Sequence, residues 1–140
     1  MKKVINIFAC ILSIYYCEAQ STGKTESKVD TLLLSKNDNR FFEVENDLTN
    51  TLKFKEVSSI LDSSKTISIQ ITFTEGAGTM LKIFNPFSKQ LIYKAELYSY
   101  RKNDYVETST VPVTPKLISY ESWPYKIDRL RLTGFRLIKE

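Results

Sequence analysis

One segment with strict two-residue periodicity constrains this chain more than any other feature of its sequence. Within Thr66–Thr74, the apolar residues Ile67, Ile69, Ile71 and Phe73 alternate with serine, glutamine and threonine. Successive side chains of a β-strand point to opposite faces of the sheet, and β-branched residues are enriched in strands. The pattern therefore predicts a strand with one buried face and one solvated face.

Turn-forming residues separate several further segments of this kind. Asn37-Asp38-Asn39, Glu75-Gly76-Ala77-Gly78 and Asn103-Asp104 are typical of turns. The segment 47–61 is also compatible with a helical turn or two, and Pro112–Pro124, which holds three of the four prolines, is expected to be irregular. Seven to eight strands at this spacing predict an all-β fold, an antiparallel two-sheet sandwich of immunoglobulin-like architecture. Besides 66–74, the predicted strands are 29–34, 41–45, 52–57, 79–85, 91–97, 105–111 and 127–138.

The last predicted strand changes phase in its middle. Leu130 and Leu132 alternate with arginines, and the apolar set resumes at Phe135 and Leu137, on the far side of Thr133-Gly134. A shift of one residue at a glycine is typical of a β-bulge, at which one strand holds an extra residue and bends. We therefore expect a bulge at Thr133-Gly134.

The N-terminus has the pattern of a secretory signal peptide. Two lysines precede an apolar run over residues 4–16, and Cys17-Glu18-Ala19 places small side chains where signal peptidase requires them. We expect cleavage after Ala19 and export to the periplasm or the extracellular space. The alternative is a lipoprotein with its lipid anchor at Cys17. Because the apolar run is shorter than the ~20 residues of a membrane-spanning helix, no transmembrane segment is expected in the mature chain.

The mature chain has the size of one domain. Removing residues 1–19 from the 140 leaves 121 residues. Residues 20–30 hold a single apolar side chain, Val29, so they are expected to form a flexible tail ahead of a sandwich domain over residues 31–140. The mature chain has 18 basic and 15 acidic residues, a net charge of +3 that is spread along the sequence, and this does not favour nucleic-acid binding.

The residue types that remain exclude several chemistries. Both cysteines lie in the leader, and the chain has no histidine. The mature protein therefore lacks a Ser-His-Asp triad, a cysteine nucleophile, a zinc site of His or Cys ligands and a disulfide. Glu43 and Glu45 share a face of a predicted strand, as paired carboxylates of a glycosidase or a calcium site do, but a solvated strand face has the same pattern. We expect no enzyme activity, no cofactor and no metal; an enzyme that uses carboxylates alone is the alternative.

Three arginines of the last predicted strand form one candidate partner-binding surface. Arg129, Arg131 and Arg136 are suited to a phosphate, an acidic sugar or a carboxylate-bearing partner. The alternative is that they form ion pairs across strands with groups such as Glu96.

A cluster of aromatic residues forms the second candidate surface. Tyr120 and Trp123 lie close together near the end of the segment expected to be irregular, and Tyr125 directly follows that segment. Exposed aromatic loops stack on sugar rings or anchor protein partners. The alternative is that Trp123 plugs one end of the sandwich core, with one of the two tyrosines exposed beside it.

Four short motifs in the C-terminal half accompany these surfaces: Ile83-Phe84-Asn85-Pro86, Leu91-Ile92-Tyr93-Lys94-Ala95, Tyr120-Glu121-Ser122-Trp123-Pro124 and Leu130-Arg131-Leu132-Thr133-Gly134-Phe135. Together they resemble a group of small exported bacterial β-sandwich proteins of uncharacterised function. The resemblance implies bacterial export and a β-sandwich, and it carries over no activity. The expected function is that of a non-catalytic module that binds a protein or glycan partner in the cell envelope, or of a structural accessory subunit of an envelope complex.

Overall fold

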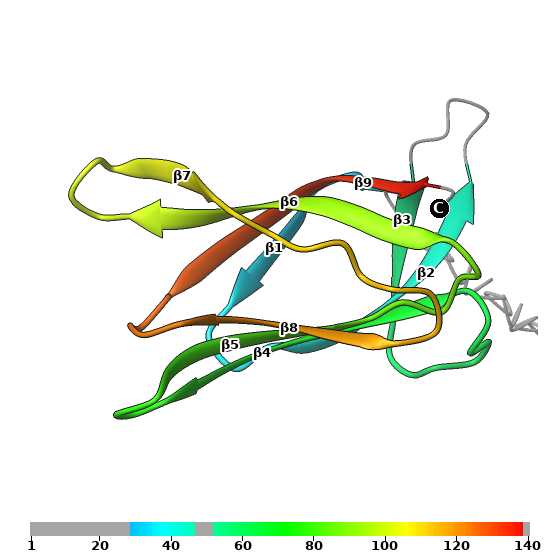
Figure 1. Cartoon of the computed structure of the whole chain (residues 1–140), viewed down its shortest axis with the longest axis horizontal. Coiled ribbons are helices and arrows are strands. Elements are labelled where there is room, and N and C mark those ends of the chain that lie inside the picture. The colour runs from blue at the N-terminus through cyan, green and yellow to red at the C-terminus, as the bar shows by residue number, and fades with distance from the viewer. Residues whose placement is uncertain (1–28, 47–51, 139–140) are drawn as a thin grey trace, which may run out of the picture.

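The computed structural model describes residues 29–46 and 52–138, and in this part of the chain it contains nine β-strands and no helix (Figure 1). The predicted leader 1–19, its cleavage site, Cys17 and most of the predicted tail lie outside the described residues. The strands are β1 (Leu32–Ser35), β2 (Asn39–Asn46), β3 (Leu52–Val57), β4 (Thr66–Thr74), β5 (Gly78–Phe84), β6 (Gln90–Ser99), β7 (Asp104–Thr108), β8 (Ile118–Trp123) and β9 (Arg129–Ile138).

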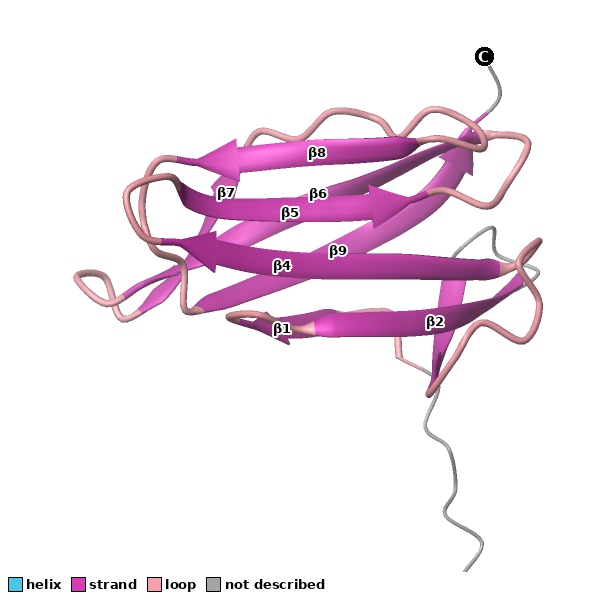
Figure 2. Ribbon diagram, turned by 90° about the horizontal axis from the view of Figure 1, so that it is seen from below, coloured by secondary structure: helices cyan, strands magenta, loops and turns pink. Residues whose placement is uncertain are grey.

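The strands form two antiparallel sheets that lie as two layers (Figure 2). The order is β1-β9-β6-β7 in the four-stranded sheet and β3-β2-β4-β5-β8 in the five-stranded sheet. Strands far apart in sequence are neighbours in both sheets, since β1 pairs with β9 and β5 pairs with β8. The prediction of an all-β fold with two antiparallel sheets is confirmed.

The hydrophobic core lies between the two sheets. Phe54 of β3 contacts Phe135 of β9 edge to face, with ring centroids 4.7 Å apart, and Phe135 stacks on Tyr93 of β6 at 5.7 Å. The predicted alternation along β4 is confirmed for Ile67, Ile69 and Ile71, which are fully buried. Burying these apolar faces supplies the main driving force for folding, at roughly 25 cal/mol per Å². Phe73, at the end of β4, is only partly buried and carries the ammonium group of Lys36 over its ring.

One predicted irregular segment is wrong. Pro112–Pro124 contains strand β8, which pairs with β5 over its whole length. The prolines misled the interpretation because they flank this strand and do not interrupt it: Pro112 and Pro115 precede Ile118, and Pro124 follows Trp123. The described residues therefore form nine strands, whereas the sequence predicted seven or eight. The alternative of helical turns in 47–61 is also wrong for residues 52–61, since β3 occupies 52–57; residues 47–51 are not described.

The two ends of the predicted domain differ in how closely they follow the sequence patterns. The bulge in β9 is confirmed, because Gly134 and Phe135 together lie opposite Tyr93, and Gly134 has φ +62°. The first strand starts later than predicted, at Leu32. Val29, which the sequence placed both at the start of this strand and at the end of the tail, lies outside β1 and pairs with Phe54 of the other sheet through two backbone hydrogen bonds of 3.2 and 2.9 Å.

Candidate functional site

The three aromatic residues of the predicted binding loop occupy three different environments. Trp123, the last residue of β8, points into the core and is 7% exposed. Tyr120, on the opposite face of the same strand, is 56% exposed, and Tyr125, in the β8–β9 loop, is 52% exposed. Trp123 is therefore not available as an exposed anchor, and its burial favours the core-plug interpretation. The sequence predicted one of the two tyrosines to be exposed beside a buried Trp123, and in the structure both are exposed.

Close backbone packing holds Trp123 in place. Its indole N–H donates to Thr108 Oγ1 of β7 over 3.4 Å, which links the two sheets. Gly78, opposite the end of β8, has φ +91°, and a Cβ atom built there would lie 2.1 Å from the Trp123 carbonyl oxygen. Only glycine allows this approach, so the position of the loop that follows Trp123 is fixed by the backbone of β5.

A buried threonine fixes the next part of the loop. The Thr79 hydroxyl donates to the Tyr125 carbonyl oxygen over 2.9 Å and accepts from the Ile127 N–H over 3.0 Å. Thr79 is buried on the core face of β5. Sequence reasoning missed this residue; the available signal was a hydroxyl at an inward position of a strand, where an apolar side chain is the usual choice.

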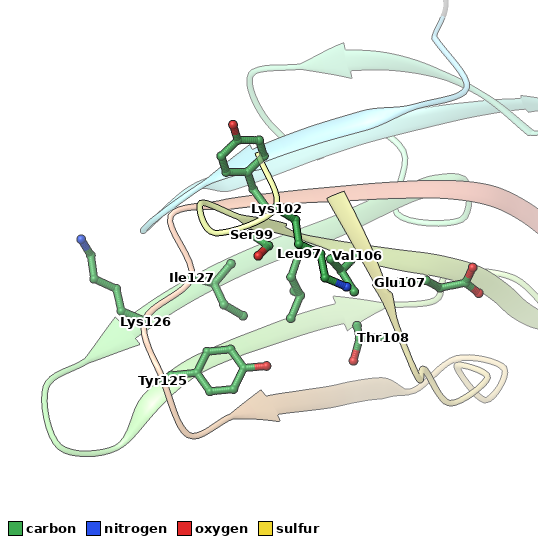
Figure 3. Close-up of a pocket in the computed structure, with 10 residues that line it drawn as sticks. Leu97, Ser99, Lys102, Val106, Glu107, Thr108, Tyr125, Lys126 and Ile127 are labelled. Atoms are coloured by element: carbon green, nitrogen blue, oxygen red, sulfur yellow. The ribbon is translucent and has the colours of Figure 1, made fainter. Parts of the chain in front are cut away.

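The loop fixed in this way forms one wall of a cavity of about 400 Å³ at this end of the sandwich (Figure 3). The opposite wall comes from the β6–β7 hairpin. The lining residues are Leu97, Tyr98, Ser99, Lys102, Val106, Glu107, Thr108, Tyr125, Lys126 and Ile127.

The cavity combines an apolar base with a few polar groups. Leu97, Val106 and Ile127 line it with aliphatic side chains, and the hydroxyl of Tyr125 points across it toward Thr108 (Figure 3). Lys102 reaches from the β6–β7 turn toward the same space. A concave site with an apolar surface and a few convergent polar groups is the usual form of a small-ligand site.

The other two charged lining residues point away from the cavity. Lys126 turns outward (Figure 3), and its ammonium group pairs with Asp128 at 2.7 Å. This pairing raises the pKa of Lys126 and lowers the pKa of Asp128. Glu107 also points away, and its carboxylate lies 3.7 Å from the Lys94 ammonium group. Neither of these charges is left for a ligand in the cavity.

The predicted arginine surface is divided between paired and exposed groups. Arg131 holds the Glu96 carboxylate through two hydrogen bonds of 2.6 and 2.9 Å, so the cross-strand pairing alternative holds for this residue. The same hydrogen bonds lower the pKa of Glu96. The Arg131 guanidinium also lies over the ring of Tyr105, at 4.2 Å from its centroid. A bidentate pair that also stacks on a ring is a structural contact rather than a free binding group.

The remaining two arginines are exposed and are not among the residues that line the cavity, although Arg129 contacts one of them, Tyr98. Arg129 packs over the ring of Tyr98 at 5.1 Å, and Tyr98 contacts Tyr105 edge to face at 5.3 Å. Arg136 lies beyond the bulge, opposite Ile92, and among the described residues it has no carboxylate partner. The structure thus does not bring the arginines and the aromatic loop into one site.

The two carboxylates of β2 that the sequence singled out each have a partner. Glu43 pairs with the Lys65 ammonium group at 3.8 Å, and Glu45 also has a partner. Within residues 29–46 and 52–138, no three Cys, Asp or Glu side chains come together as a metal site requires. The same residues include no helix with the length and apolar character to cross a membrane.

Comparison with known proteins gives no match to this chain among protein-family models, curated proteins or solved structures.

Proposed function

We propose that this chain is a non-catalytic, exported binding module that acts on a protein or glycan partner in the cell envelope. The observation that carries the proposal is the cavity of about 400 Å³ beside the half-exposed ring of Tyr125. The wall that bears this ring is held by Thr79 and by the buried Trp123, so the cavity is formed before any partner arrives. Preorganisation of this kind lowers the entropic cost of binding.

The residue types around the cavity support binding rather than catalysis. The lining side chains include hydroxyls, one outward-facing carboxylate and lysines, but no nucleophile is paired with a general base. Export is supported by the signal-peptide pattern of residues 1–19. We also propose an immunoglobulin-like class for the sandwich, supported by its four-stranded and five-stranded antiparallel sheets and by its sequence-distant strand neighbours.

A second candidate function is that of a structural accessory subunit, and a different surface favours it. Met80, Ile118 and Tyr120 are exposed on the outer face of β5 and β8, and Leu117 is exposed just before β8. β8 is an edge strand, and exposed apolar edge strands are common sites of association with other chains. Permanent contacts in a complex would cover this surface.

Partner capture from the native cells distinguishes the two functions. Tagged wild-type protein is cross-linked in intact cells and compared with Tyr125→Ala, which alters the cavity wall, and with Tyr120→Ala, which alters the outer face of β8. Both side chains are exposed, so neither truncation is expected to change stability by more than about 0.5 kcal/mol. The binding module predicts that Tyr125→Ala alone loses the partner. Loss with Tyr120→Ala alone supports the accessory subunit, and no loss with either contradicts both.

A further inference from the structure

We propose that the cavity beside Tyr125 binds a uronic acid, a pyranose ring that carries a carboxylate. This inference rests on the proposed function, since it names the ligand class of that binding site. It depends on three features of the cavity: the charge that faces it, the ring and hydroxyls that line it, and its size.

Among the charged residues that the structure places in the cavity lining, only Lys102 has a side chain that reaches toward the cavity. Lys102 has no carboxylate partner among the described residues, and its side chain reaches toward the cavity (Figure 3). The other charged lining residues are compensated, because Lys126 pairs with Asp128 and Glu107 pairs with Lys94. An unpaired ammonium group beside a concave, partly apolar site favours an anionic ligand, and it favours one carboxylate rather than a highly charged chain.

The remaining lining groups match the two chemical faces of a sugar ring. The half-exposed ring of Tyr125 offers a flat surface on which the C–H face of a pyranose stacks. The hydroxyls of Tyr125, Thr108 and Ser99 offer donors and acceptors for sugar hydroxyls. Leu97 and Val106, which lie opposite each other in the β6–β7 hairpin, supply the apolar base together with Ile127.

The size of the cavity limits the ligand. A volume of about 400 Å³ lies near the lower end of the range for small-molecule sites, which suits one sugar residue with part of a second and excludes a bulky group such as a folded peptide loop. The open side of the cavity allows the residue to be free or to be the end of a longer glycan, because both present the same ring and carboxylate.

The test is titration of the purified full chain with D-glucuronate and with D-glucose, monitored by ligand-observed NMR. The two sugars differ only at C6, which is a carboxylate in glucuronate and a hydroxymethyl group in glucose. A glucuronate-terminated oligosaccharide is titrated in parallel to distinguish the free sugar from a glycan end. We expect glucuronate to bind at least about 10-fold more tightly than glucose, and we expect its affinity to fall as the salt concentration rises.

Three variants locate the binding. Lys102→Gln is expected to abolish the preference for glucuronate over glucose. Tyr125→Ala is expected to abolish the binding of both sugars. Lys89→Gln, at an exposed lysine in the β5–β6 turn at the other end of the sandwich, is the matched control and is expected to change neither. The melting temperature of each variant is measured first, so that loss of fold is recognised.

The outcomes separate this inference from the proposed function. Equal binding of both sugars, or a glucuronate preference that survives Lys102→Gln, overturns the uronic-acid proposal and leaves a sugar-binding cavity. If neither sugar binds while Tyr125→Ala still loses the captured partner, the uronic-acid proposal is overturned and the binding module stands. If neither sugar binds and Tyr125→Ala keeps the partner, both proposals are wrong.

Discussion

Thr79→Val should destabilise the protein by removing the hydroxyl that holds the β8–β9 loop. Valine has nearly the same shape as threonine, so the substitution deletes the two hydrogen bonds to the Tyr125 carbonyl and the Ile127 N–H with little change in packing. Ile127 is buried, so its N–H loses this partner in a place away from water.

The expected size of the effect follows from these two bonds. An unsatisfied buried donor costs about 1–3 kcal/mol, and loss of the bond to the partly buried Tyr125 carbonyl costs about 1 kcal/mol. We therefore expect the free energy of unfolding to fall by about 3 kcal/mol, which for a domain of this size lowers the Tm by about 10 °C. Thr79→Ser keeps the hydroxyl and deletes one methyl group, so it should cost only about 1 kcal/mol.

Urea unfolding followed by fluorescence measures these differences, because Trp123 is the only tryptophan in the chain and lies beside the altered loop. Thr66→Val is the control at another site, where a buried threonine makes one hydrogen bond, of 2.6 Å, to the Asp62 carbonyl. The expected order of destabilisation is Thr79→Val first, with Thr66→Val and Thr79→Ser well behind it. If Thr79→Val is no less stable than Thr79→Ser, the Thr79 hydroxyl does not hold the loop.

Three further substitutions test other contacts of the fold. Gly78→Ala should lower the free energy of unfolding by about 3–5 kcal/mol, because the added Cβ meets the Trp123 carbonyl oxygen. The control Gly76→Ala also has a positive φ, of +79°, but its Cβ has no atom within 4 Å, so it should cost only about 1–2 kcal/mol. Equal urea midpoints for the two variants would refute the close approach at Gly78. Asn85→Ala should lower the free energy of unfolding by about 2–4 kcal/mol, because the buried amide donates to three backbone carbonyls, that of Val113 at 2.9 Å and those of Lys89 and Thr114. Calorimetry measures the effect, and a Tm within 2 °C of wild type, on the order of 0.5 kcal/mol, would contradict this expectation. Glu96→Gln should make the free energy of unfolding less dependent on pH in the acid range. The pKa of Glu96 is lower in the folded state than in the unfolded state, so the ionised carboxylate stabilises the fold above about pH 4.5. This stabilisation is lost as the pH falls through the folded-state pKa. An unchanged slope of the urea midpoint between about pH 5 and pH 3 would contradict that pairing.

Periodicity predicted those parts of the fold in which one face of a strand is buried. The alternation of 66–74 and the phase shift at Thr133-Gly134 both express the local rule that side chains alternate across a strand, and the structure follows them. β8 could not be recognised by the same rule, because its sequence, ISYESW, carries a serine and a glutamate at two of its three inward positions. The inward Glu121 accepts a hydrogen bond of 2.7 Å from the Val111 N–H, a partner that no local pattern reveals.

The candidate site was predictable only in part for a similar reason. The cluster of aromatic residues at 120–125 located the loop, but the division into a buried Trp123 and exposed tyrosines depends on the register of β8 against β5. The cavity lies between the β6–β7 hairpin and the β8–β9 loop. Because Lys102 and Tyr125 are far apart in the sequence, no local pattern indicates that both line it. An arginine on a strand has the same sequence pattern whether it is free or paired, so only the structure shows that Arg131 pairs with Glu96.

Photo-cross-linking in intact cells tests most directly whether the cavity is the binding surface. Benzoylphenylalanine replaces Tyr125, in the cavity wall, or Tyr120, on the outer face of β8, and each protein is irradiated before its intact mass is measured. The binding module predicts a covalent adduct from position 125 and none from position 120. An adduct from position 120 alone, or from neither position, would contradict it.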